Sequence, residues 1–302
     1  MPDGRTDIIG LGVIAIDDML YVDSYPAANA KVWINGHRRQ GGGNVSCGLA
    51  AAARLGSWCA LLGRLGGNEL SRFARAGLTA AGVDLSLVVD DPEAEPLHCT
   101  IVVAADTGSR AIYADYSAVK PLEPWELRPE WFAGGKVFLV DNLHPPAILP
   151  AVRMARDAGL TVVSDIERDM PDLLEIRRYV DHYICSAEFA LPYTGCLSPV
   201  SACEAMARSV DHASVVVTAG EAGCYWRLAG MQGTRHVPAH PVETVDTTGC
   251  GDVFHGAFCH GLVQGWAMER TIAFANAAAA VKATRTGGWA AVPTLREVER
   301  ML

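Results

Sequence analysis

The most informative segment of the sequence is Asp246-Thr247-Thr248-Gly249-Cys250-Gly251-Asp252, and it is followed by Val253-Phe254-His255-Gly256-Ala257-Phe258. Two glycines flank one small residue directly before a helical pattern. Three successive backbone N–H groups can therefore converge on an anion, with the dipole of the helix behind them. Asp252 stands at the same helix start, where a carboxylate can accept a proton from a hydroxyl while the amides hold the negative charge that develops. The alternative is a tight turn in which Asp252 is an ordinary helix N-cap.

The composition is typical of a globular chain whose surface is not strongly basic. Of the 302 residues, 50% are hydrophobic and 20% are charged, and the formal net charge is -9. This acidic balance argues against a nucleic-acid-binding surface, which needs clustered Lys and Arg. Any phosphate-binding pocket must therefore be local.

The sequence shows neither a secretory leader nor a membrane span. Residues 1–7 lack the charged start and the apolar core of a signal peptide, and no apolar stretch approaches the roughly 18–20 residues that cross a bilayer. The nine cysteines are scattered and form no C-x-x-C pair, which is typical of free thiols in a reducing compartment. We therefore expect a cytoplasmic protein with neither nucleic-acid nor membrane partners.

Short apolar runs rich in β-formers alternate with Ala-rich helical stretches, which indicates a parallel sheet covered by helices. The predicted strands are Asp7–Gly12, Trp58–Leu62, Lys136–Asp141, Thr161–Asp165, Tyr179–Cys185 and Ser214–Thr218. The predicted helices are Val45–Leu55, Leu70–Ala81, Ala147–Ala158, Pro199–Ser209, Asp252–Gln264 and Met268–Thr284.

Two regions, Asp18–Gln40 and His98–Tyr116, interrupt this rhythm with alternating patterns that carry β-branched and aromatic residues. Such patterns predict antiparallel strands inserted between the parallel ones. We expect them to form a small sheet that stands off the main domain near its ligand cleft.

A second glycine-rich segment, Gly41-Gly42-Gly43-Asn44, runs into the predicted helix Val45–Leu55. Glycines let a backbone approach a ligand closely, and the Asn44 amide offers both a donor and an acceptor to hydroxyl groups. A loop that merely packs against the sheet is an equally good interpretation of this segment alone.

Two more segments end predicted strands with polar groups or glycines. Ile9-Gly10-Leu11-Gly12-Val13-Ile14-Ala15-Ile16-Asp17 ends in a carboxylate, and Asp18 beside it is the competing candidate. A dinucleotide fingerprint would need a third glycine where Ala15 stands. Val215-Val216-Val217-Thr218-Ala219-Gly220-Glu221-Ala222-Gly223 is a strand followed by a glycine turn, which alone is an ordinary structural feature.

Together these segments resemble the ribokinase-like (pfkB) carbohydrate kinases, from Ile8 to about Pro293. The first segment is similar to the family signature D-T-x-G-A-G-D, with Cys250 in place of the usual alanine. The resemblance implies an α/β fold, with a three-layer α/β/α domain, a mainly parallel central sheet and a small β-sheet lid. It implies one kinase domain over residues 1–302, with lid strands inserted at about 18–40 and 98–116.

By the same resemblance, the chain is an ATP-dependent kinase that phosphorylates a hydroxyl of a small sugar or sugar derivative. Asp252 would be the catalytic base, and the amides of Gly249, Cys250 and Gly251 would form the anion hole. The implied substrate-binding residues are Asp17, Gly42, Gly43, Asn44 and Asp252. The G-G-N form of the second segment resembles the ketohexokinases.

The segments around Asp252 and Arg285 look most like those of sulfofructose kinases. Lys31 stands where those enzymes place a basic lid residue that meets the anionic group, so Lys31 is a candidate substrate ligand. A solvated surface lysine is the alternative. Ketohexoses, acidic or sulfonated sugars, pentoses and nucleosides all remain candidate substrates.

The strand and turn ending at Gly223 are similar to the V-T-x-G-x-x-G nucleotide loop of the family. The implied ATP-binding residues are Ser186, Thr218, Gly220, Gly223, Gly249, Gly251 and Asn276. Magnesium should accompany ATP in phosphoryl transfer. Its ligands stay open, because Ser186 and Phe189 stand where many relatives carry the N-x-x-E motif.

The resemblance further implies a monovalent cation such as K⁺ beside the anion-binding loop, with Asp246 and Thr248 as ligands, and a homodimer contact through the lid.

Three alternatives stay open: a non-catalytic sugar or nucleotide sensor on the same fold, a nucleoside kinase, and a nicotinamide oxidoreductase. A sensor need not keep Asp252, and the incomplete fingerprint at Ala15 disfavours the oxidoreductase.

Overall fold

The structure of the protein, a computed structural model, describes residues 6–107, 109–210 and 212–302. Residues 1–5, which begin the stretch that we compared with a signal peptide, lie outside the described residues. So does position 108 of the second predicted insertion.

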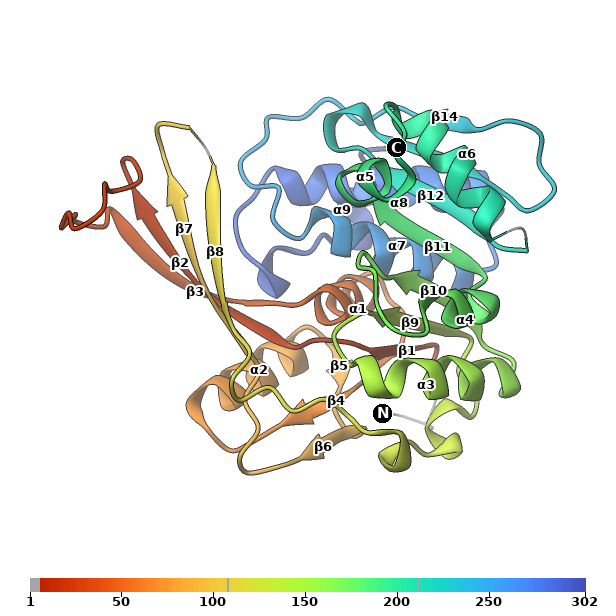
Figure 1. The fold of residues 1–302 in the computed structure, drawn as a ribbon, viewed down its shortest axis with the longest axis horizontal. Helices are drawn as coiled ribbons and strands as arrows, with labels where there is room; N and C mark the ends of the chain where they lie inside the picture. The colour runs from red at the N-terminus through yellow and green to blue at the C-terminus, as the bar shows by residue number, and fades with distance from the viewer. Residues whose placement is uncertain (1–5, 108, 211) are drawn as a thin grey trace.

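One large sheet forms the centre of the main body (Figure 1). Ten strands of the described chain build it in the order β14-β13-β12-β11-β10-β9-β1-β4-β5, with β6 also paired to β4. Its pairs are parallel except β12–β13 and β13–β14. The strands are β1 (Ile8–Leu11), β4 (Cys59–Leu65), β5 (Val83–Asp84), β6 (Val88–Asp90), β9 (Val137–Asp141), β10 (Thr161–Asp165), β11 (His182–Ser186), β12 (Ser214–Thr218), β13 (Cys224–Arg227) and β14 (Arg235–Val237).

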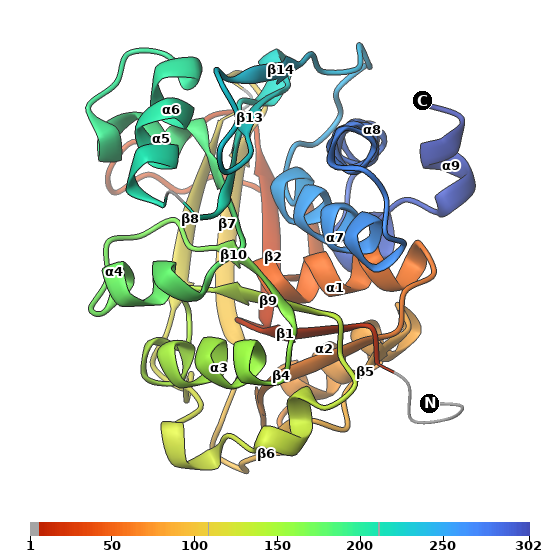
Figure 2. The same cartoon turned by 90° about the vertical axis from the view of Figure 1, so that its right-hand side faces the viewer.

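Helices cover both faces of this sheet, as Figure 2 shows. One face carries α1 (Asn44–Arg54), α2 (Glu69–Ala80), α7 (Cys250–Val263), α8 (Met268–Ala283) and α9 (Leu295–Glu299). The other carries α3 (Pro145–Asp157), α4 (Leu173–Ile176), α5 (Ala187–Thr194) and α6 (Pro199–Ser209). The predicted α/β/α layers, the six predicted strands and the six predicted helices are confirmed. Among the described helices, none has the length and apolar character that a membrane crossing requires.

A small second sheet extends away from the main body on one side (Figure 1). Its order is β3-β2-β7-β8, and its strands are β2 (Ala15–Val22), β3 (Gly36–Gly42), β7 (Leu97–Ala104) and β8 (Arg110–Asp115). The predicted antiparallel pairing holds for β2–β3 and β7–β8 and is wrong for β2–β7, which is parallel. The reason is that β2 and β7 both run outward from the main body, and β3 and β8 return.

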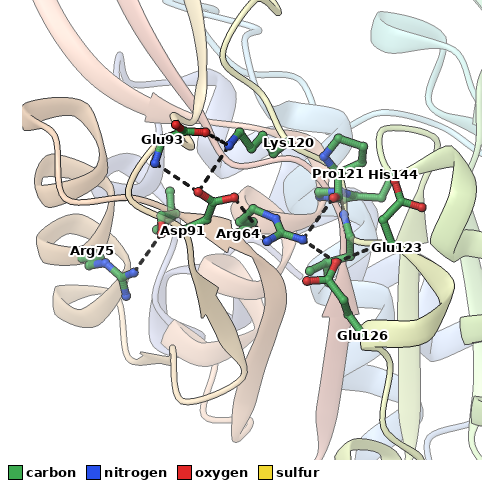
Figure 3. Close-up of polar contacts among 11 residues, drawn as sticks. Arg64, Arg75, Asp91, Glu93, Lys120, Pro121, Glu123, Glu126 and His144 are labelled. Carbon is green, nitrogen blue, oxygen red and sulfur yellow. Dashed lines mark hydrogen bonds and ion pairs between the residues drawn. The ribbon is translucent and has the colours of Figure 1, made fainter.

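A polar network fixes the base of the β7–β8 hairpin to the main body (Figure 3). The largely buried Arg64 guanidinium on β4 contacts the carboxylates of Asp91, at 3.5 Å, and Glu126, and it donates to the Pro121 carbonyl at 3.4 Å. Lys120 pairs with the same Asp91 at 3.3 Å. The segments that enter and leave the hairpin are therefore held to one strand of the main sheet, β4.

Helices α1 and α7 approach each other more closely than side chains would permit. A methyl group on Gly256 of α7 would lie 2.0 Å from the Gly48 carbonyl oxygen of α1, and one on Gly48 would lie 3.3 Å from the Asp252 carbonyl oxygen. Glycine permits this approach because it has no Cβ. The N-termini of the two helices are consequently held side by side.

We predict that Gly256→Ala destabilises the protein. The added methyl group must push α1 and α7 apart, and overpacking of this kind costs about 1–3 kcal/mol. Intrinsic helix propensity acts in the opposite direction, because alanine is better than glycine by about 1 kcal/mol inside a helix. A denaturant titration with Gly67→Ala as control, where an added methyl group meets nothing within 4 Å, measures the net sign. Unchanged or higher stability of Gly256→Ala would contradict the close-packing account.

Candidate active site

A cavity of about 550 Å³ lies between the small sheet and the starts of α1 and α7. Strands β2, β7 and β8 line one side, and the connections that follow β9 and β10 line another. Seven residues predicted from the sequence line this cavity: Asp17, Gly42, Gly43, Asn44, Thr248, Gly249 and Asp252. Segments far apart in the sequence therefore meet at one place.

Asp17 lies on β2 with its side chain buried, 7% exposed, at the wall of the cavity. Burial raises the pKa of its carboxyl group to about 6, although the nearby side chains of Cys99 and Gln40 oppose this shift. A methyl group on Gly42 would lie 2.5 Å from Asp17 Oδ2, so the glycine makes room for the carboxylate. The competing Asp18 instead pairs with Arg39, at 2.8 Å, and with His98 and His37.

Gly43 and Asn44 form the start of α1. Gly43 is the N-cap residue with a φ of 95°, a conformation that disfavours side chains, and a methyl group there would lie 2.3 Å from the Val13 carbonyl oxygen. This turn brings the Asn44 side chain to the cavity, where its nearness opposes the rise in the pKa of the Asp165 carboxyl group.

Asp252 occupies the first turn of α7, half-buried at the cavity wall. Burial is the main cause that raises the pKa of its carboxyl group to about 7, and the nearby Asp165 and Asp141 act in the same direction. His255 opposes the shift; its Nε2 lies 3.5 Å from Asp165 Oδ1. An Asp with a pKa near neutrality is suited to accept a proton from a substrate hydroxyl.

Asp141 and Asp165 are buried carboxyl groups near this site that our sequence prediction did not include. They end the neighbouring strands β9 and β10, and Asp141 accepts hydrogen bonds from the backbone N–H groups of Val13, at 3.1 Å, and Leu143, at 2.9 Å. Burial raises the pKa of Asp141 to about 6 and raises that of Asp165 well above its usual range. Both residues end predicted parallel strands, and ligands bind at the carboxyl ends of such strands, so their positions could have identified them as candidate site residues.

The predicted anion-binding amides lie at the turn into α7. Gly249, the N-cap residue, has a φ of 77°, and the Cys250 N–H donates to the Thr247 carbonyl oxygen at 3.2 Å. The Cys250 amide thus helps to close the turn. The Gly251 amide falls in the first helical turn, where backbone N–H groups have no intrahelical partner.

The predicted ATP-binding residues Ser186, Thr218, Gly220, Gly223 and Asn276 are not among the residues that line the cavity. Ser186 and Thr218 end β11 and β12. The Asn276 amide on α8 donates to the Pro238 carbonyl oxygen at 2.7 Å, and a methyl group on Gly223 would lie 2.1 Å from the Val237 carbonyl oxygen. Asn276 thus anchors the chain after β14, and Gly223 permits the close approach of β14.

Glu167 and Ser186, near the end of β11, are the candidate polar residues for the predicted magnesium ion. The Glu167 carboxylate lines the cavity and accepts a hydrogen bond from the Ser186 N–H, while Ser186 Oγ caps α5. Repulsion by Glu167 contributes to the raised pKa of Asp165. Over the described ranges no group of three or more His, Cys, Asp and Glu could hold a metal ion. The carboxylate chemistry fits Mg²⁺ that arrives with nucleotide phosphates, which Glu167 would meet.

Asp246, one of the two predicted monovalent-cation ligands, lies beside a buried lysine. Asp246 Oδ1 accepts a hydrogen bond from the Thr248 N–H at 2.9 Å, and Asp246 Oδ2 lies 4.0 Å from Lys282 Nζ. The residues present therefore do not fit an added K⁺ ion, because the ammonium group already lies among the oxygens.

Lys31 does not reach the cavity. It lies on the exposed connection between β2 and β3, with its Nζ 5.5 Å from the centre of the Trp33 ring, and it is not among the lining residues. The cationic side chains that line the cavity are Arg110 and Arg168, which we did not predict. Arg110 on β8 donates to Thr248 Oγ1 at 3.1 Å, which joins the small sheet to the loop that precedes α7.

Comparison with known proteins agrees with this geometry. Residues 9–295 match the model of the pfkB family carbohydrate kinases. The chain belongs to this family.

Named relatives match over nearly their whole length. Fructokinase-1 of Oryza sativa subsp. japonica is 29% identical over 99% of this chain and 98% of its own. The Bacillus subtilis ribokinase is 24% identical over 98% of this chain and 99% of its own. The structure of Arabidopsis thaliana ribokinase complexed with ribose and ATP has a TM-score of 0.86 at 19% identity and covers 98% of both chains. The predicted family, fold class and enzyme class, a carbohydrate kinase, are thereby confirmed.

We predict that Asp252→Asn stabilises this pfkB protein at alkaline pH. The folded state binds the Asp252 proton more tightly than the unfolded chain, whose Asp pKa is about 4. Ionisation therefore costs stability as the pH rises from about 4 through 7, and the full cost is present above 7.

Melting temperatures of both proteins at about pH 5 and about pH 8 test this prediction. The Asn variant should melt higher than the wild type at the alkaline pH, and the difference should shrink at the acidic pH. The exposed Glu299→Gln controls for the loss of a carboxylate. A difference that does not change with pH would contradict the raised pKa of Asp252.

Proposed function

We propose that this carbohydrate kinase transfers the γ-phosphoryl group of ATP to a hydroxyl group of a sugar or sugar derivative, with Asp252 as the catalytic base. One observation carries the proposal: Asp252, with a pKa near 7, lines the same cavity as Asp17 and Asn44. A non-catalytic sensor has no use for a carboxylate tuned in this way at a helix start.

In the proposed reaction the sugar lies between Asp17, Asn44 and Asp252. Asp252 accepts the proton of the reacting hydroxyl, and the hydroxyl oxygen forms a bond to the γ-phosphorus while the bond to the β–γ bridging oxygen breaks and ADP leaves. The amides of Gly249 and Gly251 and the dipole of α7 stabilise the negative charge on the phosphoryl group. When bound with ATP, Mg²⁺ neutralises charge on the β- and γ-phosphate oxygens.

We place ATP along the loop from Thr218 to Gly223 and beside α8, with its γ-phosphate at the turn into α7. The support is topological, because nucleotides bind beyond the carboxyl ends of parallel strands, and Thr218 ends β12 there. Since the Asn276 amide is held by Pro238, α8 would border the adenine through its surface and not through that amide.

The small sheet would act as a lid over the sugar. Ile101 of β7 and Ile112 of β8 line the cavity, so the sheet can exclude water that would otherwise hydrolyse ATP. We propose that the whole chain, 1–302, is one kinase domain with this lid. The homodimer contact through the lid stays a prediction, which the exposed Trp33 and Tyr113 support.

The substrate class stays open among ketohexoses, acidic or sulfonated sugars, pentoses and nucleosides. Arg110 and Arg168 at the cavity wall support an acidic sugar. The location of Lys31 on the exposed connection beside Trp33 gives no such support.

The first test of the proposed function is Asp252→Asn, assayed by ADP release with the most active sugar of a panel. Loss of a general base typically lowers the rate on the order of 10²–10⁴-fold, and the loss should fall on kcat and not on KM for ATP. Asparagine caps helices about as well as aspartate. A folded variant with nearly unchanged turnover would therefore show that Asp252 is only an N-cap.

The second test is the pH dependence of kcat/KM for the sugar. Because the reaction needs Asp252 without its proton, kcat/KM should rise with pH and level off above a midpoint of about 7. An ordinary Asp, with a pKa of about 4, would give a flat profile from about pH 5.5 upward. A flat profile would contradict the assignment of Asp252 as a base with a raised pKa.

A further inference from the structure

Lys282, near the end of α8, is a buried lysine surrounded by oxygen atoms. Its side chain is 1% exposed. Its Nζ donates to the carbonyl oxygens of Asp246, at 3.4 Å, and Arg285, at 3.3 Å, and lies 4.0 Å from the Asp246 carboxylate. Two backbone carbonyls and one carboxylate form the kind of oxygen cage that binds a small cation.

The lysine lies directly behind the turn into α7. A methyl group on Gly249 would lie 3.9 Å from Lys282 Cε and 3.8 Å from Asp252 Oδ2, so the lysine stem and the proposed base flank the same residue. The backbone N–H groups of Val245 and Asp246 both donate to the Ala283 carbonyl oxygen, at 2.8 and 3.1 Å. The end of α8 therefore supports the whole loop that leads to the anion hole.

Burial of an ammonium group is costly unless it is paired and hydrogen-bonded. The oxygens around Lys282 Nζ offset that cost, and the positive charge in return holds the loop. The charge also reaches the loop residues, because Lys282 opposes the burial that raises the pKa of the Cys250 thiol to about 11. A lysine that only capped the C-terminus of α8 would contact only the last carbonyl groups of that helix. Lys282 also contacts Asp246, which belongs to the loop.

We propose that the Lys282 ammonium group is a built-in cation at the place where a bound K⁺ ion was predicted, and that this protein's phosphoryl transfer is independent of monovalent cations. Lys282 is thus a positioning residue, which acts through the loop 246–251 and does not touch the substrate. Only the kinetic part of this inference, a rate that is independent of monovalent cations, rests on the proposed function.

The test compares the wild type with Lys282→Ala in buffers that contain choline, K⁺ or NH₄⁺ as chloride salts at one ionic strength. The wild-type rate and melting temperature should be the same in all three. In choline, Lys282→Ala should lose about 10–100-fold in kcat, as is typical when the groups that orient a site are removed. K⁺ and NH₄⁺ should restore part of the rate and raise the melting temperature of this variant alone, because a bound ion stabilises the folded state by mass action.

Lys136→Ala, which removes a half-exposed lysine paired with Asp7 at 3.2 Å, is the matched control and should respond to no cation. Lys282→Met keeps the bulk without the charge and serves if the Ala variant does not fold. It should lose activity and gain nothing from K⁺, since no space opens.

Two results would overturn the proposal: a wild type whose rate or melting temperature needs K⁺, or Lys282 variants that match the wild type in choline. The melting-temperature measurement requires no substrate, so its result does not depend on whether the proposed kinase activity is found. A failure of the function alone would leave the cation dependence of stability measurable.

Discussion

The contact between Gly48 of α1 and Gly256 of α7 is the constraint on which the site depends. Because neither residue has a side chain, the backbones of the two helices nearly touch. Their N-termini therefore meet at one cavity, where α1 presents Asn44 and α7 presents Asp252. A wider separation would move the proposed base, Asp252, away from Asn44, which is proposed to hold the sugar.

The sequence was sufficient to predict what depends on local pattern. Buried strands such as Val137–Asp141 were readable as apolar runs, and the turn into α7 was readable from its glycines. Features that depend on sheet order were not. The meeting of Asp141 and Asp165 requires that β9 and β10 be neighbours, and the parallel β2–β7 pair requires the directions in which both hairpins leave the main body. The sequence places Asp141 and Asp165 at strand ends, but no local signal gives the order of the strands or the directions of the hairpins.

The electrostatics of the site divide into two parts. On the cavity side, burial raises the pKa values of Asp141, Asp165 and Asp252, and repulsion by neighbouring carboxylates adds to the rise for Asp165 and Asp252. These carboxyl groups are therefore poised to take up protons. Behind the loop, Lys282 supplies a positive charge that Asp246 and two carbonyls hold. The sequence pattern hid this lysine, since it interrupts an Ala-rich helix whose inward face cannot be recognised without the loop that it meets.

The most direct measurement of the central claim is the fate of the γ-phosphoryl group. The protein would be incubated with Mg²⁺ and ATP labelled at the γ-phosphate, with and without each member of a sugar panel, and the labelled products would be separated. We expect the label to move to a hydroxyl of at least one sugar in equal amount to the ADP formed, with little label released as inorganic phosphate. Label that stays in ATP with every sugar, or that appears only as inorganic phosphate, would contradict it.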